Sequence, residues 1–200
     1  MTSRVLLPPL AQRLVPIRNG IIRASLQLVI GVALLALLAQ VRIEIGPVPI
    51  TGQTLGVLLI GSTYGTWLGG LTLTAYLLAG GLGLGVFAGG AAGWSVLTGA
   101  TAGYLFGFVA AAAVVGYLAQ RGWDRHYRRT ALAMLIGNII IYLPGLWWLS
   151  RFAPDGATTL QWGLTPFIPG DLIKLLLAVA LLPTAWRLLG RQSGSSGVDG

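Results

Sequence analysis

Residues 21–41 read IIRASLQLVIGVALLALLAQV, an apolar run with one arginine near its start. About 20 consecutive apolar residues are enough for a helix to cross the hydrocarbon core of a bilayer. This stretch has that length, and it carries too few polar side chains for the surface of a soluble domain. It predicts a membrane-spanning helix and thereby decides the class of fold.

The rest of the chain has the same character. Of its 200 residues, 55% are hydrophobic and 9% are charged, whereas an average soluble domain is about 25% charged. Five further apolar segments follow the first, at 55–68, 71–88, 94–119, 131–150 and 170–189. Together they predict an all-α membrane protein whose six transmembrane helices form one domain over residues 21–190.

The chain has a formal net charge of +8, and the placement of its arginines indicates membrane topology rather than nucleic-acid binding. Only Arg42 and Arg151 fall in the predicted external loops. The other ten gather before or at the first span, between the fourth and fifth spans, and after the last span: Arg4, Arg13, Arg18, Arg23, Arg121, Arg125, Arg128, Arg129, Arg187 and Arg191. With six spans, all these positions fall on one side. Because Lys and Arg are enriched in cytoplasmic loops, we expect both termini to be cytoplasmic.

Two terminal segments flank the predicted bundle. Residues 1–20 carry leucines at helix-like spacing, interleaved with arginine and interrupted by proline, which predicts a cytoplasmic or interfacial segment. We expect no cleavable signal peptide, because these residues lack a continuous apolar core. Residues 191–200 end in SGSSGVDG and are expected to form a flexible tail, part of which reads as an added linker.

Small residues recur at every fourth position in three rows: Gly61, Gly65 and Gly69; Gly81, Gly85, Gly89 and Gly93; Gly99, Gly103, Gly107 and Ala111. Such rows let helices approach closely in lipid, so they predict tight packing within the bundle. The second row has another interpretation, because its glycines are dense enough to break a helix. It would then form an external loop.

The last span opens with PFIPGDLIKLLLA, residues 166–178, which places Asp171 and Lys174 on one face at the start of a helix. Lys174 is the only lysine in the chain. Ionisable side chains within a span are costly and usually functional, and this pair offers an acceptor for N–H groups and a cation for a carboxylate. The alternative is structural: Asp171 caps the helix and Lys174 pairs with it.

Other polar side chains are candidates to complete a pocket: Thr51, Gln53 and Thr54 in the first external loop, and Tyr76, Asn138 and Tyr142 within spans. Asn138 and Tyr142 lie at positions i and i+4 of one segment, and therefore on one helix face. For Asn138, a hydrogen bond between helices is an equally good interpretation.

Little in the sequence suggests catalysis. The chain has no cysteine, and its one histidine, His126, lies in the polar loop RGWDRHYRR. There is no metal-ligand cluster, no nucleophile beside a base and no Walker loop. We therefore expect no catalytic residue, no metal site and no cofactor, and we expect any ATP hydrolysis to reside in partner proteins.

Three stretches together resemble the BioY family, the biotin-specific substrate-binding (S) components of energy-coupling factor (ECF) vitamin transporters. They are AQVRIEIGPVPITGQTLGVLLIG (39–61), YLLAGGLGLGVFAGGAAGW (76–94) with TGATAGYLFGF (98–108), and IYLPGLWWL (141–149) with PFIPGDLIKLLLA (166–178). The resemblance runs from about residue 25 to residue 188.

The resemblance implies the ECF S-component fold, multi-pass in a prokaryotic cell membrane, with a biotin pocket open to the outside. It also implies high-affinity capture of biotin and its uptake together with a membrane coupling protein and two ABC-type ATPases, while a homo-oligomer is left open. Thr51 and Gln53 belong to the segment that resembles the family's closing loop. Gly89 and Gly90 belong to the loop that resembles the part holding the bicyclic head of biotin.

Within the resemblance, Asp171 and Lys174 match the family's GD-x-x-K binding signature. Asp171 would accept hydrogen bonds from the ureido N–H groups of biotin and Lys174 would neutralise its carboxylate, or the pairing is reversed. The chain departs from the family at Gly85, where a proline is usual. Two alternatives stay open: an S component for a different vitamin, and a structural subunit in which the Asp–Lys pair satisfies itself without a ligand.

Overall fold

The computed structural model describes residues 7–14 and 17–195, and within these the side chains of residues 7–13 and 17–189. Arg4, the Arg191 side chain and residues 196–200 of the predicted tail lie outside this part of the chain. In order, the elements are α1 (Leu10–Leu14), α2 (Gly20–Gln40), β1 (Arg42–Ile43), β2 (Ile50–Thr51), α3 (Gln53–Tyr64), α4 (Thr66–Gly81), the 3-10 turn η1 (Ala88–Gly90), α5 (Trp94–Thr98), α6 (Ala102–Gln120), η2 (Trp123–Arg125), α7 (Tyr127–Leu149), α8 (Gly156–Gly163), η3 (Thr165–Phe167) and α9 (Ile168–Ser195).

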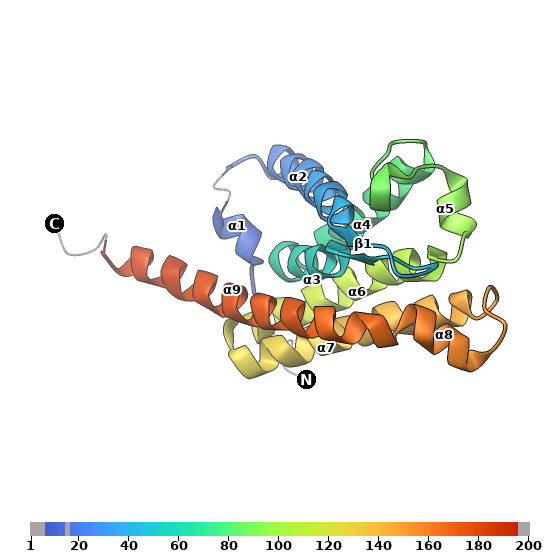
Figure 1. Ribbon diagram of the computed structural model, residues 1–200. Coiled ribbons are helices and arrows are strands. Elements are labelled where there is room, and N and C mark those ends of the chain that lie inside the picture. The colour runs from blue at the N-terminus through green and yellow to red at the C-terminus, as the bar shows by residue number, and fades with distance from the viewer. Residues whose placement is uncertain (1–6, 15–16, 196–200) are drawn as a thin grey trace, which may run out of the picture.

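Helix α6 is the centre of the molecule and packs against α7, α3 and α4, while α9 runs beside α7 (Figure 1). Close packing of α6 on α7 depends on small residues. A Cβ atom at Gly107 would lie 3.0 Å from the Cα atom of Ile141, and a side chain at Gly103 would collide with the backbone of Pro144. The third row of small residues therefore packs helices together as predicted.

Within the described residues, four helical stretches are long and apolar enough to cross a membrane: Gly20–Gln40, Ala102–Gln120, Tyr127–Leu149 and Gly156–Leu189. The last combines α8, η3 and most of α9. Helices α3 and α4 have 12 and 16 residues, fewer than the ~20 that a comfortable crossing needs. The chain thus has a helical membrane fold with four candidate spans and two shorter helices in the bundle.

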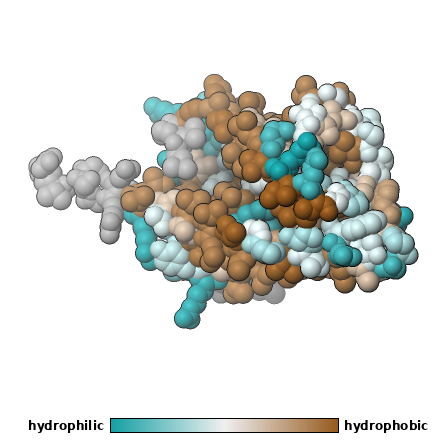
Figure 2. All heavy atoms as spheres, in the orientation of Figure 1, coloured by the Kyte–Doolittle hydropathy of each residue, from teal (hydrophilic) through white to brown (hydrophobic). Residues whose placement is uncertain are grey.

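Apolar side chains cover much of the face that α2 and α9 present in Figure 2, whereas paler and more polar side chains gather around α8. Helix α2 buries a narrow stripe, formed by Gln27, Gly31, Leu35 and Ala39. Its remaining surface is apolar as well and exposes residues such as Ile21 and Leu37. A helix that is hydrophobic on its exposed side suits contact with lipid.

The predicted boundary between the second and third segments, 55–68 and 71–88, is wrong. Helix α3 ends at Tyr64 and α4 begins at Thr66, so the chain turns at Gly65. Gly65 has φ 81°, which side-chain-bearing residues rarely adopt. A side chain at Gly116 of α6 would collide with the backbone of this turn. The GSTYG motif therefore ends a helix instead of lying within one.

Residues 82–93 form a loop, which confirms the second interpretation of that glycine row. Several of its glycines have positive φ: Gly83, Gly89, Gly90 and Gly93. The predicted fourth segment, 94–119, is also divided, because α5 ends at Thr98 and α6 begins at Ala102. The indole Nε1 of Trp148 donates a hydrogen bond to the carbonyl oxygen of Gly99 (2.9 Å) and ties this break to α7.

One short hairpin departs from the predicted all-α fold. Strands β1 and β2 pair antiparallel, with Arg42 opposite Thr51 and Ile43 opposite Ile50. The backbone N–H of Gly52 then donates to the carbonyl oxygen of Leu38 at the end of α2. The hairpin therefore folds back onto α2 and fixes where α3 begins.

Both ends of the described chain contain helical structure. Near the N-terminus, the described residues include the short helix α1, which is held to α2 by a hydrogen bond from Gln27 Nε2 to the carbonyl oxygen of Ala11 (3.1 Å). At the other end α9 continues to Ser195, into the segment that was expected to be flexible.

Candidate ligand-binding site

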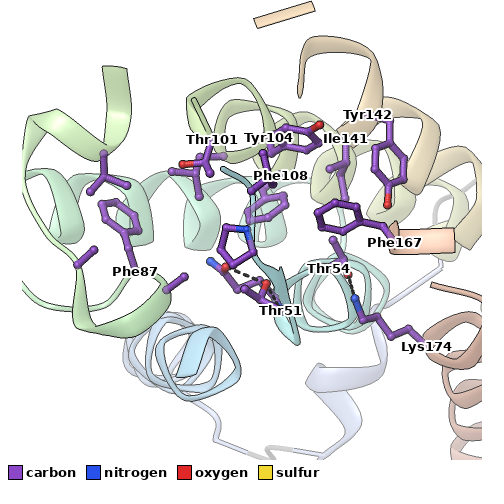
Figure 3. A pocket seen from close by; sticks show the side chains of 17 residues that line it. Thr51, Thr54, Phe87, Thr101, Tyr104, Phe108, Ile141, Tyr142, Phe167 and Lys174 are labelled. Atoms are coloured by element: carbon purple, nitrogen blue, oxygen red, sulfur yellow. Dashed lines mark hydrogen bonds between the residues drawn. The ribbon is translucent and has the colours of Figure 1, made fainter. Parts of the chain in front are cut away.

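A cavity of about 200 Å³ lies at the end of the bundle where α3 and α9 begin and α7 approaches its end. It is lined by Val48, Pro49, Thr51, Gln53, Thr54, Phe87, Ala88, Ala91, Val96, Thr101, Tyr104, Leu105, Phe108, Ile141, Tyr142, Phe167 and Lys174 (Figure 3). Sites for small molecules combine an apolar lining with a few placed polar groups and typically measure ~300–1,000 Å³. This cavity has that lining and, being smaller, suits one small molecule.

Aromatic side chains form one wall of the cavity. Tyr104 and Phe108 lie one turn apart on α6 and face the same way. The ring of Tyr142 lies 6.1 Å from that of Tyr104 and 6.3 Å from that of Phe167, both edge-on. The Tyr104 hydroxyl donates to the carbonyl oxygen of Gly163 (2.9 Å). Edge-on contacts of this kind are favourable, so the wall is a fixed surface for a flat apolar group.

Polar side chains converge at one end of the cavity (Figure 3). Lys174 Nζ donates to Thr54 Oγ1 at 2.8 Å and to Asp171 Oδ1 at 3.2 Å. The Tyr142 hydroxyl donates to the other carboxylate oxygen of Asp171. The side chains of Lys174 and Asp171 are only 15% and 9% exposed. A buried ion pair is tolerated when further hydrogen bonds satisfy both partners, and Thr54 and Tyr142 provide them.

The starts of two helices bring this cluster together. Asp171 and Lys174 share a face in the first turns of α9, and a carboxylate near a helix N-terminus interacts favourably with the helix dipole. Thr54 lies in the first turn of α3. Asp171 does not itself line the cavity. It holds Lys174 and Tyr142, which do.

A second chain of hydrogen bonds supports the other side of the cavity. Thr51 Oγ1 donates to Gln53 Oε1 (2.9 Å), and Gln53 Nε2 donates to the hydroxyl of Tyr76 (2.8 Å). That hydroxyl donates in turn to the carbonyl oxygen of Val86 (2.8 Å). The ring of Tyr76 also meets Phe87 edge-on at 5.4 Å. These contacts connect the hairpin and the start of α3 to the 82–93 loop.

The structure sorts the predicted site residues by their position. Five of them line the cavity: Thr51, Gln53, Thr54, Tyr142 and Lys174. Asp171 and Tyr76 contact lining residues from behind. Gly89 and Gly90 lie in η1, between the lining residues Ala88 and Ala91.

Asn138 is set apart from this group. It lies one turn before Tyr142 on α7, is buried and does not line the cavity. Its Oδ1 atom has no hydrogen-bond partner among the residues that the structure describes. This atom therefore makes no hydrogen bond between helices within that part of the chain, and the ligand contact of Asn138 stays a prediction.

The aromatic lining is the part that the sequence analysis missed: Phe87, Tyr104, Phe108 and Phe167. The spacing of Tyr104 and Phe108 in TGATAGYLFGF was the available signal. It is weak, because Phe106 between them is also aromatic and is 51% exposed on the outside of the bundle. In a helix that is apolar all round, spacing alone does not distinguish a cavity from lipid.

Arg42 stands beside the loop that borders the cavity. A side chain at Gly89, where φ is 70°, would collide with the Arg42 guanidinium. Arg42 Nη1 also lies 2.8 Å from Glu44 Oε1, and the two side chains are 38% and 67% exposed. Arg42 is therefore a solvent-accessible cation beside Gly89, which follows the lining residue Ala88 in the chain.

These features define a helical membrane protein with a mostly apolar pocket at one end of its bundle. Comparison with known proteins identifies the family. The profile of the BioY family matches residues 11–191, and the chain belongs to this family.

Relatives and a solved structure are similar over most of the chain. The probable biotin transporter BioY of Pyrococcus horikoshii is 38% identical over 150 residues, which are 75% of this chain and 88% of the relative. The biotin transporter BioY of Thermotoga maritima is 37% identical over 149 residues, 74% and 87% of the two chains. A crystal structure of the S-component for biotin from an ECF-type ABC transporter matches with a TM-score of 0.74 at 26% identity, covering 86% of this chain and 94% of that one. The fold is thus similar to that of an ECF S component.

Proposed function

We propose that the chain captures biotin at the external side of a prokaryotic cell membrane, as the S component of an ECF-type ABC transporter. The observation that carries this proposal is the cavity with an aromatic wall and with Thr54, Lys174, Asp171 and Tyr142 joined at one end. A bicyclic molecule with a polar ureido group and an apolar ring suits that combination. The names of the relatives and of the matching crystal structure support biotin as the ligand.

The proposal includes a membrane topology and partners. Helices α2, α3, α4, α6, α7 and α9 would be the six transmembrane helices, with both termini in the cytoplasm, because the arginine-rich segments then share one side. Energy for uptake would come from two ABC-type ATPases that act through a membrane coupling protein. No cofactor is needed for binding.

The charge of the polar cluster favours one orientation of biotin. Lys174 and Asp171 already neutralise each other, so a carboxylate placed beside them would leave an uncompensated buried charge, which is costly. A neutral ureido group carries no such cost. An ammonium group has three N–H donors, and Lys174 uses two of them on Thr54 and Asp171. The third has no acceptor among the described residues and would donate to the ureido oxygen.

The carboxylate of biotin would then point toward the 82–93 loop and Arg42, while the thiophane ring lies along the aromatic wall. Of the two pairings that the sequence left open, this orientation gives Lys174 the ureido group and not the carboxylate. It leaves Asp171 as the residue that holds Lys174 and Tyr142 in place.

Calorimetric titration of biotin into the purified protein tests the proposal. We expect Lys174→Ala to weaken binding about 10-fold or more, because a hydrogen bond to a charged group is lost. Arg128→Ala is the matched control, since Arg128 is exposed and does not line the cavity. A wild-type protein that binds no biotin but binds another vitamin would contradict the substrate. Unchanged binding by the Lys174 variant would contradict the site.

A further inference from the structure

A second cavity, of about 280 Å³, lies at the opposite end of the bundle from the biotin pocket. Gly20 and Arg23 at the start of α2 line it, as does Gln120 at the end of α6. The biotin pocket, in contrast, is lined from the start of α6. Helix α1 lies beside the second cavity, near the N-terminal end of α2 (Figure 1).

Two of the side chains that line this second cavity, those of Arg23 and Gln120, carry N–H donors that are not fully used. Gln120 Oε1 accepts hydrogen bonds from the backbone N–H of Thr66 (3.1 Å) and from its hydroxyl (2.8 Å). The amide oxygen is therefore occupied, and within the described part of the chain the Gln120 Nε2 group has no acceptor. The guanidinium of Arg23 likewise has no ion pair or hydrogen bond among the described residues.

Among the residues that the structure describes, no carboxylate lines this cavity. The remaining lining is neutral and consists of Pro9, Ala11, Gln12, Ala24, Gln27, Tyr64, Trp67 and Leu68. A guanidinium group and an amide N–H group without an acceptor, in the lining of one cavity that holds no acidic residue, suit an anion. Phosphate oxygens are favoured partners, because a guanidinium binds them through parallel N–H groups.

The surroundings of this second cavity indicate the kind of molecule that carries the anion. Trp67, which lines the cavity, is 89% exposed, and Ile21, which follows the lining residue Gly20 on α2, is 80% exposed. Tryptophan is enriched where membrane spans meet water. Helices α2 and α4, which carry Ile21 and Trp67, pack against each other. An anion bound at Arg23 therefore lies at the membrane boundary, next to apolar surface that lipid chains would cover.

We propose that this second cavity binds the phosphate headgroup of an anionic phospholipid, with Arg23 as the cation and Gln120 as a hydrogen-bond donor. The acyl chains lie along the outer surfaces of α2 and α4, beside Trp67. Basic pockets between membrane helices bind anionic headgroups in this way.

Native mass spectrometry of the purified protein tests the proposal, with phosphatidylglycerol and phosphatidylcholine of equal chain length added in turn. We expect preferential retention of phosphatidylglycerol, and at least a roughly five-fold loss of that retention in Arg23→Gln, as for removal of one cation near an anionic surface. Arg18→Gln is the matched control, because Arg18 is exposed nearby and does not line the cavity. Ala24→Phe narrows the cavity without a change of charge and should also reduce retention.

The outcomes separate the explanations. Equal losses in Arg23→Gln and Arg18→Gln would mean general surface attraction and would overturn the proposal, as would equal retention of the two lipids. Displacement of the lipid by millimolar inorganic phosphate would mean a soluble anion and would overturn the choice of a lipid. An unchanged unfolding temperature of Arg23→Gln in lipid-free detergent, together with selective loss of phosphatidylglycerol, would support the proposal and rule out misfolding as the cause.

Discussion

Two cations, Lys174 and Arg42, decide between the two orientations of biotin. Biotin methyl ester keeps the ureido ring but lacks the negative charge of the acid. If Arg42 faces the carboxylate, Arg42→Gln weakens binding of biotin by up to about five-fold, the scale of an exposed ion pair, and leaves binding of the ester unchanged. Lys174→Ala weakens binding of both compounds, because it removes the donor to their common ureido group. Calorimetry with the two ligands measures this difference.

Glu44→Gln is the matched control, because it removes the anionic partner of Arg42 while leaving the cation in place. Biotin binding by that variant should be unchanged or tighter. If Lys174→Ala weakens the acid but not the ester, the carboxylate lies at Lys174 and our orientation is wrong.

Asp124 is a second buried acidic residue, and it lies in η2, outside the membrane-spanning segments. Its Oδ2 atom accepts a hydrogen bond from Trp186 Nε1. Burial raises the pKa of Asp124 above the ordinary value of 3.8, although the hydrogen bond from Trp186 and the charges of Arg125 and His126 act in the opposite sense. The folded protein therefore binds this proton more tightly than the unfolded chain. Stability must fall as the pH rises from about 3.8 through the raised pKa, and it stays lower above that value.

Asp124→Asn removes this titration while keeping an oxygen acceptor for Trp186. We expect the variant to gain in unfolding temperature relative to the wild type as the pH is raised from about 4 to about 7. Asp155→Asn is a control of opposite sign, because hydrogen bonds from Thr158 lower the pKa of Asp155. The wild type should lose stability relative to that variant as the pH falls. Parallel curves for Asp124→Asn and the wild type would contradict the assignment.

At the scale of elements, α3 approaches α6 through Gly61. A Cβ atom there would lie 2.6 Å from the carbonyl oxygen and 2.9 Å from the Cα atom of Ala112. Both are backbone atoms, so Gly61→Ala forces the helices apart, and we expect a loss of about 1–3 kcal/mol in the free energy of unfolding. At Gly70→Ala the nearest atom lies 3.6 Å away, an ordinary contact, and stability should be unchanged or higher. Equal unfolding curves for the two variants in one detergent would exclude close packing at Gly61.

The sequence predicted the first span well and the α3–α4 corner poorly. Residues 21–41 and α2 (Gly20–Gln40) differ by one position at each end, because a long apolar run leaves a helix few places to begin or end. At Gly65 the turn depends on a positive φ and on the close approach of Gly116. Hydropathy indicates neither the positive φ nor the close approach, because the residues on both sides of the corner are apolar and belong to helices.

Hydropathy also limits what can be predicted of the pocket: its charged residues are predictable from sequence, and its aromatic residues are not. Asp171 and Lys174 stand out from sequence because a charge within an apolar span needs a reason. The cavity-facing Tyr104 and the exposed Phe106 do not differ in this way, since lipid and the inside of a pocket are both apolar. Only the packing of α6 against α7 and η3 determines which aromatic side chain faces inward.

At the scale of the whole molecule, the two ends are built differently. The biotin pocket and its loops occupy one end. At the other end, the Arg125 and Arg13 guanidinium groups lie 4.1 Å and 5.4 Å from the Trp186 ring. These contacts join η2 and α1 to α9 where the arginines gather, as expected for the cytoplasmic side.

This difference between the two ends of the molecule predicts its membrane topology. The chain has no cysteine. A single cysteine substitution therefore shows which side of the membrane its position faces, without background labelling. Glu44→Cys and Ala157→Cys lie at exposed positions at the end with the pocket, and Arg18→Cys and Arg128→Cys at exposed positions at the other. In intact cells a membrane-impermeant maleimide should label the first two and reach the last two only after the membrane is opened.

Labelling of Arg18→Cys and Arg128→Cys from different sides would require an odd number of spans between them, and α3 or α4 would then fail to cross. Matching access for Arg18→Cys and Arg128→Cys, with the opposite access for the other two, is what a six-helix protein with a pocket open to the outside must show.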